Sequence, residues 1–320
     1  MKLKIITILV ILIVGLSIFV SGCTDAGDSG DDKNTGQEAE MSETDEPILV
    51  AVSVVPQAEF VEKVGGDKVK TVVIIPPGAD PHTYELSPKE VQKISKASML
   101  VTVGVGMPFE EVWVDKFETT NSGTLIVNCS KGLELRELEE HDHEEEEGDH
   151  DDESDEDHEE LDPHIWTSPA NAKIMVEDIY EGLVELDPEN EAYYAQNKDA
   201  YLEELDALDE RIREKLEGSE GSNFMVYHPS WGYFAADYGL NMISVEIEGK
   251  EPSAQDLAKL VDLAKEKNVK VIFVQSQFST RSAEVLAQEI GGEVVAVDPI
   301  AKDYITNMDN VSDIFARNLV

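Results

Sequence analysis

Cysteine is nearly absent from this 320-residue chain, and basic residues are scarce. Lysine and arginine number 25 against 68 acidic residues, which gives a formal net charge of −43. This charge disfavours nucleic acids and anionic lipid surfaces as partners, because both are negatively charged themselves. It is compatible with cations, and equally with a soluble protein that lives in salt. The two cysteines, Cys23 and Cys129, cannot form a disulfide framework if Cys23 is modified, as the start of the chain predicts.

Long apolar runs are missing except at the start of the chain. Lys2 and Lys4 precede an almost unbroken apolar run over residues 5–20, shorter than the about 20 residues that a membrane span needs. A basic start, an apolar middle and small residues are typical of a secretory signal. Val20-Ser-Gly-Cys23 resembles a prokaryotic lipobox, which implies cleavage and a lipid on Cys23. Alternatively, residues 1–22 form an uncleaved anchor. Both readings place the rest of the chain outside the cytoplasm.

Composition and pattern divide the chain into five parts. A polar segment without aromatic residues follows the signal and predicts a disordered tether. We expect a signal peptide at 1–22, the tether at 23–47, an N-terminal α/β lobe at 48–187, a linking helix at 188–217 and a C-terminal α/β lobe at 218–320.

Short apolar runs rich in Val and Ile alternate with helix-length segments after the tether. Near-continuous apolar strands are typical of parallel sheets with both faces covered. The alternation predicts two α/β lobes, each with a parallel four-stranded sheet flanked by helices. The predicted strands are 48–53, 69–75, 98–103 and 124–128 in the first lobe, and 223–227, 240–245, 269–274 and 293–297 in the second. Predicted helices include 87–97, 252–267 and 279–290.

One long amphipathic helix is predicted between the lobes. Residues 189–216 contain no Gly or Pro, and leucines and Ile212 recur there at spacings of three and four. Asp187-Pro188 supplies a plausible N-cap and first turn. A helix over 188–216 would reach about 43 Å and could span both lobes.

An acidic segment holds four of the seven histidines. Residues 137–160 contain 17 acidic residues and only three residues that are neither acidic nor His, so they cannot bury a core. We expect a disordered loop whose imidazoles form weak, exchangeable sites for zinc-like metals. The alternative is a solubility loop in which His is accidental. The histidines are His141, His143, His150 and His158.

The other three histidines, His82, His164 and His228, share a local setting. Each lies in a turn beside Pro, with an aromatic residue two or three positions later. His82 and His228 follow predicted strands, and Asp298 ends the last one. Ligands of open α/β sheets bind outside the carboxyl ends of the strands, so we expect the four side chains to converge between the lobes. Three imidazoles and a carboxylate suit four-coordinate Zn²⁺, and manganese prefers more oxygen ligands.

From residue 48 onward the chain resembles the metal-binding solute receptors of ABC transporters, in particular the zinc-uptake lipoproteins. The resemblance lies in Asp80-Pro-His-Thr-Tyr-Glu85, the acidic His-rich loop, Asp162-Pro-His-Ile-Trp166, the long helix and His228-Pro-Ser-Trp-Gly-Tyr-Phe234. It implies two similar lobes with the metal in the cleft between them. It also implies His82, His164 and His228 as ligands, with Asp298 as the fourth.

Departures from the family pattern occur at Leu86, Ser168 and Gln275, where Pro, Asp and Glu are common. They put the affinity in more doubt than the identity. Asp80 and Asp162 could each orient an imidazole or simply cap a turn.

The resulting hypothesis is a monomeric, lipid-anchored zinc receptor on the outer face of the cytoplasmic membrane that delivers Zn²⁺ to an ABC permease. It predicts no enzymatic activity, because a site filled by protein ligands leaves no position for a catalytic water. A manganese receptor is the alternative within this class. A surface zinc hydrolase and a metal buffer or adhesin are the others, although the chain lacks His-Glu-x-x-His and Gly-x-Ser-x-Gly.

Overall fold

The structure is a computed structural model that describes residues 46–120, 123–138, 161–247 and 249–319. The predicted signal peptide, the tether, Cys23 and the four histidines of the acidic segment lie outside these residues. Among the described helices, none combines the length and apolar character needed to cross a membrane.

The first sheet has the parallel strand order β2-β1-β3-β4. Val50 pairs with Thr71 on one side of β1 and with Met99 on the other, which sets the register of the three strands. In β3 all four residues are buried, as expected for a strand with both faces covered. The strands are β1 (Ile48–Val52), β2 (Val69–Val73), β3 (Met99–Thr102) and β4 (Leu125–Asn128).

The second sheet repeats this topology in the parallel order β6-β5-β7-β8. Side chains of a strand alternate between faces. Phe224 and Val226 accordingly join one hydrophobic cluster, and Met225 and Tyr227 join another on the opposite face. The strands are β5 (Asn223–Val226), β6 (Asn241–Ser244), β7 (Val271–Val274) and β8 (Glu293–Ala296). All eight predicted strands are confirmed, with ends shifted by no more than two residues.

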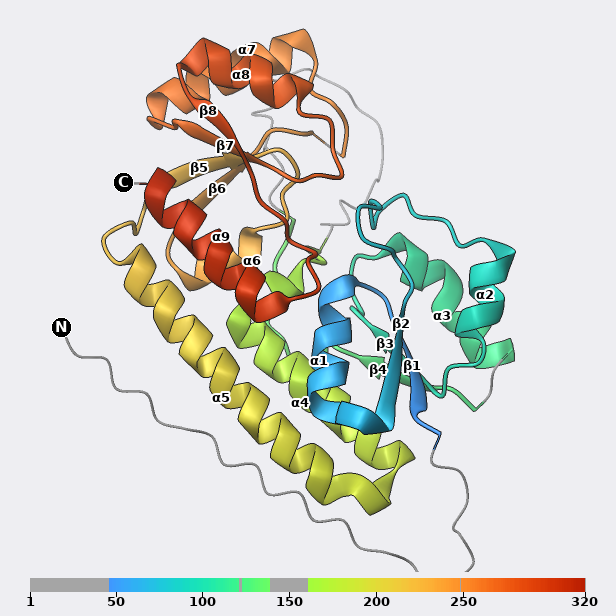
Figure 1. Cartoon of the computed structure of the whole chain (residues 1–320). Helices are drawn as coiled ribbons and strands as arrows, with labels where there is room; N and C mark the ends of the chain where they lie inside the picture. Colours follow the sequence, from blue (N-terminus) through green and yellow to red (C-terminus); the bar gives the residue numbers. More distant parts are fainter. Residues whose placement is uncertain (1–45, 121–122, 139–160, 248, 320) are drawn as a thin grey trace, which may run out of the picture. The chain divides into compact units, whose positions relative to one another are not determined.

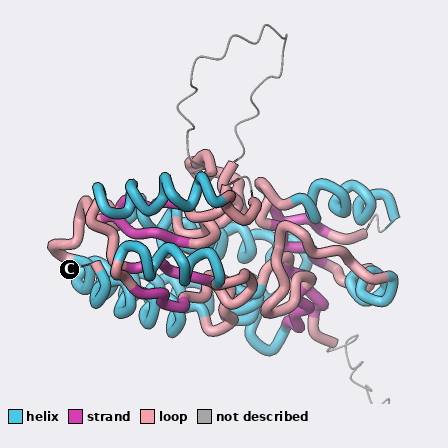
Figure 2. Tube along the Cα trace, turned by 90° about the horizontal axis from the view of Figure 1, so that it is seen from above, coloured by secondary structure: helices cyan, strands magenta, loops and turns pink. Residues whose placement is uncertain are grey.

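Helices cover the sheets (Figures 1 and 2). Several begin at side-chain caps: Ser87 and Glu90 form a capping box before α2, and the Ser168 hydroxyl accepts a hydrogen bond from Asn171 N at the start of α4. The remaining elements are α1 (Val55–Gly65), α2 (Pro88–Ile94), α3 (Pro108–Thr120), α4 (Pro169–Leu186), α5 (Glu191–Leu216), α6 (Gly232–Asp237), α7 (Ala254–Glu266), α8 (Arg281–Ile290) and α9 (Tyr304–Asn318), with 3-10 turns η1 (Gly66–Lys68), η2 (Ile165–Thr167) and η3 (Pro188–Asn190).

The long helix is present, but its α-helical part begins three residues later than predicted. Residues 188–190 form the 3-10 turn η3, and α5 runs from Glu191 to Leu216. The Asp187 carboxylate accepts hydrogen bonds from the Asn190 amide and the Tyr194 hydroxyl, which holds the tight turn in place. Helix α5 packs against α1 and α4, which precede it in the chain, and against α9 near the end of the described residues.

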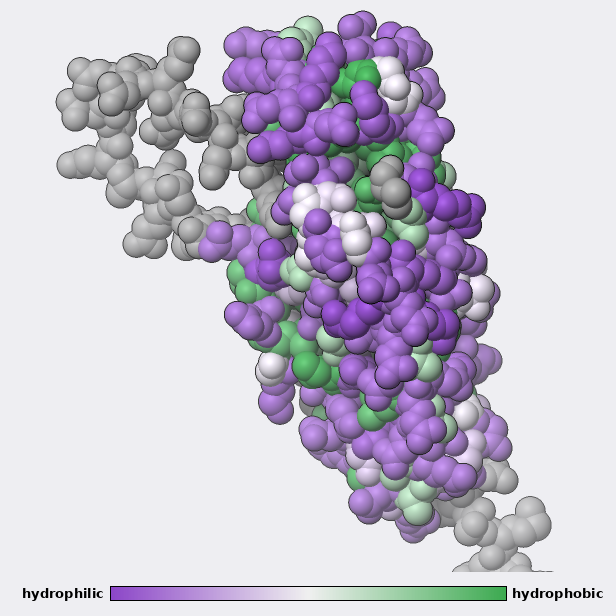
Figure 3. All heavy atoms as spheres, turned by 90° about the vertical axis from the view of Figure 1, so that its left-hand side faces the viewer, coloured by the Kyte–Doolittle hydropathy of each residue, from purple (hydrophilic) through white to green (hydrophobic). Residues whose placement is uncertain are grey.

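The two sheets share one continuous hydrophobic core. Phe315 of α9 stacks on Phe273 of β7 at 4.3 Å, and both belong to the cluster that also contains β1 and β3. Trp166 donates its indole N–H to the Pro299 carbonyl at 2.7 Å, and the Tyr304 hydroxyl donates to the Trp166 carbonyl at 2.9 Å. These bonds fix the segment before α9 against η2. The face seen in Figure 3 is mainly hydrophilic, as the acidic composition requires.

Candidate metal site

Three histidines from distant parts of the sequence meet where the carboxyl ends of strands face each other. His82 lies on the segment after β2, His228 follows β5, and His164 precedes η2. The ring centroids are 4.9 Å apart for His82 and His228, 5.0 Å for His164 and His228, and 5.5 Å for His82 and His164. One ring nitrogen of each residue lies within 4.8 Å of the other two, so the described residues contain a group that could hold one metal ion.

The spacing of the nitrogens matches that of ligands on one zinc ion. Nε2 of His164 and Nε2 of His228 are 3.2 Å apart. Two nitrogens at about 2.0–2.1 Å from a tetrahedral zinc lie about 3.3–3.4 Å from each other. Both side chains are buried, with His164 3% and His228 6% exposed. The structure therefore presents two imidazole nitrogens at almost the separation that a shared cation requires.

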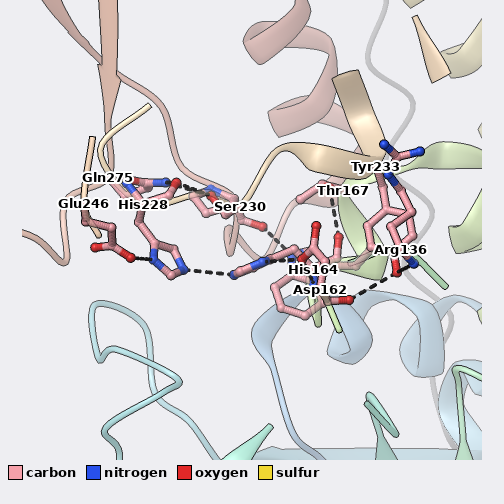
Figure 4. Close-up of polar contacts among 11 residues, drawn as sticks. Arg136, Asp162, His164, Thr167, His228, Ser230, Tyr233, Glu246 and Gln275 are labelled. Carbon is pink, nitrogen blue, oxygen red and sulfur yellow. Dashed lines mark hydrogen bonds and ion pairs between the residues drawn. The ribbon is translucent and has the colours of Figure 1, made fainter. Parts of the chain in front are cut away.

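A carboxylate pairs with the Nδ1 atom of each of these two rings, on the side away from the other histidine (Figure 4). Asp162 Oδ1 lies 2.7 Å from His164 Nδ1, and Glu246 Oε1 lies 2.5 Å from His228 Nδ1. An ionised carboxylate only accepts hydrogen bonds, so each Nδ1 carries the hydrogen and each Nε2 is left as a bare electron-pair donor. Asp162 also accepts from the backbone N–H of His164 at 2.8 Å, so this residue both orients the ring and caps the turn.

His82 is held differently. Asp80 accepts hydrogen bonds from the His82 backbone N–H and the Thr83 hydroxyl, so it caps the turn rather than orienting the imidazole. The Nε2 atom of His82 is buried and has no hydrogen-bond partner among the described residues. Buried polar atoms normally have a partner. A cation shared with the other two imidazoles would provide one, so the donor set fits a metal ion.

Burial favours the neutral form of two of the imidazoles, those of His82 and His164. Desolvation, followed by the charges that His164 and His228 would carry, lowers the pKa of His82 from 6.5 to about 2. Burial also lowers the pKa of His164, although Asp162 acts in the opposite direction. A neutral imidazole is the form that coordinates metal. The site is thus prepared for a cation without first losing protons from these two residues.

Residues at the ends of neighbouring strands fix the loop that carries His228. Gln275, just after β7, donates from Nε2 to the His228 carbonyl at 2.8 Å and to the Ser230 hydroxyl at 2.7 Å. Phe278 stacks on the His228 ring at 4.8 Å with an interplanar angle of 24°. A cavity of about 320 Å³ opens beside His82 and His228 and gives an ion a route to the site.

Asp298, predicted as the fourth ligand, lies outside this three-histidine group. It follows β8, and its carboxylate accepts a hydrogen bond from the backbone N–H of Ile300 at 2.9 Å. The structure thus brings together three of the four predicted ligands.

Sequence reasoning missed Glu246 as a partner of His228, and noted Gln275 only as a departure from the family pattern. Glu246 did leave a signal, because it is a single acidic residue between Val245 and Ile247 at the end of an apolar run. An acid in such a place is rarely buried unless it is paired. The pattern could have marked Glu246 as a buried acid, although not its partner.

Comparison with known proteins gives a consistent result. Residues 50–318 match the family described as the periplasmic zinc-uptake complex component A. The high-affinity zinc uptake system protein ZnuA of Bacillus subtilis is 33% identical over 293 residues, covering 90% of this chain and 87% of that protein. A crystal structure of ZnuA is similar at a TM-score of 0.77, with 37% identity and coverage of 86% of this chain and 100% of that one. An internal deletion mutant of ZnuA with zinc bound has a TM-score of 0.76, 37% identity, and coverage of 85% and 98%.

Proposed function

The chain belongs to the periplasmic zinc-uptake complex component A family, and from this membership we propose that it is an extracytoplasmic receptor that captures Zn²⁺ and delivers it to the permease of an ABC importer. The observation that carries the proposal is the convergence of three buried imidazoles, with two Nε2 atoms 3.2 Å apart. His82, His164 and His228 are the proposed ligands.

The donor set favours zinc over the alternative cargo, manganese. Imidazole nitrogens suit Zn²⁺, whereas Mn²⁺ is better served by carboxylate, carbonyl and water oxygens. Asp298, the oxygen donor predicted from the sequence, accepts a hydrogen bond from Ile300 N at Oδ1 and lies outside the three-histidine group. With nitrogen donors in the majority, we expect zinc to bind more tightly than manganese.

Carriage explains the site better than hydrolysis does. The family is a transport family, and the two carboxylates beside the histidines, Asp162 and Glu246, are already engaged at Nδ1 atoms. Neither carboxylate is free to act as a general base on a metal-bound water. The proposed role therefore includes no enzymatic activity.

Some finer features of the proposal concern residues outside the described part of the chain. We propose a signal peptide at 1–22, a lipid on Cys23 that anchors the protein to the outer face of the cytoplasmic membrane, and a monomer divided into the lobes and linking helix expected above. Auxiliary, weaker metal sites in the acidic loop complete the proposal, at His141, His143, His150 and His158.

A chelator-competition titration of the full chain with Zn²⁺ and Mn²⁺ tests the function. We expect zinc to bind more tightly than manganese, and His82→Ala, His164→Ala and His228→Ala each to abolish high-affinity binding. Unchanged tight binding in all three variants would refute the assignment. Asp298→Asn, measured in parallel, shows whether the carboxylate contributes.

Deleting residues 139–160 separates a receptor from a metal buffer. Glu137 and Leu161 form an isolated bridge, so the deletion joins parts of the chain that already lie close together. A receptor retains its high-affinity site after the deletion, whereas a buffer or adhesin that depends on the loop loses it.

A further inference from the structure

We infer that Glu246 is a positioning residue that selects which nitrogen of His228 faces the metal, an inference that rests on the proposed function. The basis is the pair formed by the Glu246 carboxylate and His228 Nδ1 at 2.5 Å, with Nε2 of the same ring turned towards His164 (Figure 4). Glu246 is not a ligand itself, because it lies on the opposite side of the ring from the other histidines.

The Glu246 side chain has no other hydrogen bond among the described residues. Its backbone is held independently: its N–H donates to the Tyr227 carbonyl at 3.0 Å, and its carbonyl accepts from the Ser244 hydroxyl at 2.8 Å. The loop does not therefore depend on the carboxylate for its conformation. This differs from Asp162, which also caps its own turn.

Burial of this carboxylate is costly unless it is compensated. Glu246 is 6% exposed, and a buried charge needs a partner. His228 supplies one hydrogen bond but no positive charge while it is neutral. A divalent cation bound to neutral imidazoles brings two positive charges into the site, and Asp162 and Glu246 together supply two negative ones. The pair of carboxylates thus matches the charge of the cargo.

His164 and His228 are each oriented by a carboxylate in the same way. In each, a carboxylate accepts the Nδ1 hydrogen of one histidine and leaves Nε2 bare, as at Asp162–His164 and Glu246–His228. Such partners fix the tautomer and raise the basicity of the ligand nitrogen. With both Nδ1 hydrogens held by carboxylates, the two Nε2 atoms, 3.2 Å apart, are left to present their electron pairs to a cation.

The experiment compares Glu246→Gln, Glu246→Ala and the control Glu293→Gln in the full chain. Gln keeps the size and an acceptor oxygen but not the charge, whereas Ala removes both. Glu293 is exposed, at the amino end of β8 and so at the edge of the sheet away from the histidines. Two quantities are measured: zinc affinity by chelator competition, and the ¹⁵N chemical shifts of the imidazole nitrogens, with and without zinc at pH 8.

We expect His228 to carry its hydrogen on Nδ1 in the wild type, with zinc on Nε2. Glu246→Gln should keep this signature but bind zinc about 10-fold more weakly, and Glu246→Ala should lose up to about 100-fold and the fixed tautomer. Glu293→Gln should match the wild type. Thermal unfolding of each metal-free variant checks folding, and if Glu246→Ala does not fold, Glu246→Gln decides.

Zinc on Nδ1 of His228, or zinc affinity of Glu246→Gln within threefold of the wild type, would overturn the inference. Failure of the proposed function gives a different result, namely no tight zinc binding by the wild type. In that event the metal-free spectra still decide the role of Glu246, because the Nδ1 hydrogen should be fixed in the wild type and not in Glu246→Ala.

Discussion

Acid should weaken zinc binding far less than three ordinary histidines would allow. An imidazole with a pKa of 6.5 is neutral in about three-quarters of molecules at pH 7 and in about 3% at pH 5, so proton competition costs about 25-fold per ligand. Three such ligands would cost roughly ten-thousand-fold. In this protein the pKa of His82 is lowered to about 2, mainly by burial, and that of His164 is lowered as well. His82 therefore stays neutral at pH 5, and His164 holds a proton less often than an ordinary imidazole does, so we expect a loss below about 600-fold, the cost of two ordinary ligands.

The assay is a zinc titration with chelator competition at pH 7, 6 and 5, corrected for protonation of the chelator. Calorimetry in buffers of different ionisation enthalpy counts the protons released at pH 5.5. Three ordinary imidazoles would release about 2.7 protons there, whereas a site in which His82 is already neutral should release fewer than two. Circular dichroism at each pH confirms that the chain stays folded. A loss of a thousand-fold or more, or release of two protons, would refute the neutral-imidazole site.

Three other predictions concern stability. The metal-free protein should lose free energy of unfolding as the pH falls below about 6.5, because the unfolded chain then protonates histidines that the fold keeps neutral. Urea melts at several pH values should show this loss. A free energy of unfolding that does not change with pH, or a pH dependence equally steep in His82→Ala, would contradict the prediction. Zinc at about a thousand times its dissociation constant should add about 4 kcal/mol, an effect that a chelator removes; a melting temperature indifferent to zinc would argue against a folded-state site. Gly182→Ala in α4 should destabilise by about 1–3 kcal/mol despite its higher helix propensity, because a Cβ there would lie 2.5 Å from Val127 Cγ2. The control Glu181→Ala, at an exposed neighbouring position, should leave the free energy of unfolding nearly unchanged in the same melts. A stabilised Gly182→Ala would contradict the prediction, because it would show that Val127 in β4 moves to make room for the Cβ.

The sheets and the meeting of the histidines could be predicted because both follow from simple rules. Buried parallel strands are apolar on both faces, so runs such as Val271–Val274, all four residues buried, stand out in the sequence. Parallel strands end at the same edge, so residues that follow them are close together even when they are far apart along the chain. These rules place His82 and His228 at the carboxyl edges of two different sheets, and the expectation that ligands bind between the two lobes brings the histidines together.

Side-chain direction could not be predicted from the same rules. Asp298 follows its strand just as His228 does, but its carboxylate turns back to Ile300 N, a local choice that spacing does not reveal. Glu246 is recognisable as an acid within an apolar run, and only the fold shows that the end of β6 lies beside β5 and hence beside His228. The long helix starts at Pro188 as predicted, but spacing does not reveal that its first turn, 188–190, is 3-10 rather than α-helical.

The bridge between Glu137 and Leu161 makes the position of the metal site independent of the length of the acidic segment. Its two ends are paired, and Asp162 N–H donates to the Arg136 carbonyl at 2.8 Å immediately before the Pro163-His164 turn. Lengthening a loop between fixed ends costs only about 0.6 kcal/mol per doubling. A change in the length of the segment between these ends therefore costs little free energy of folding and leaves the backbone position of His164 unchanged.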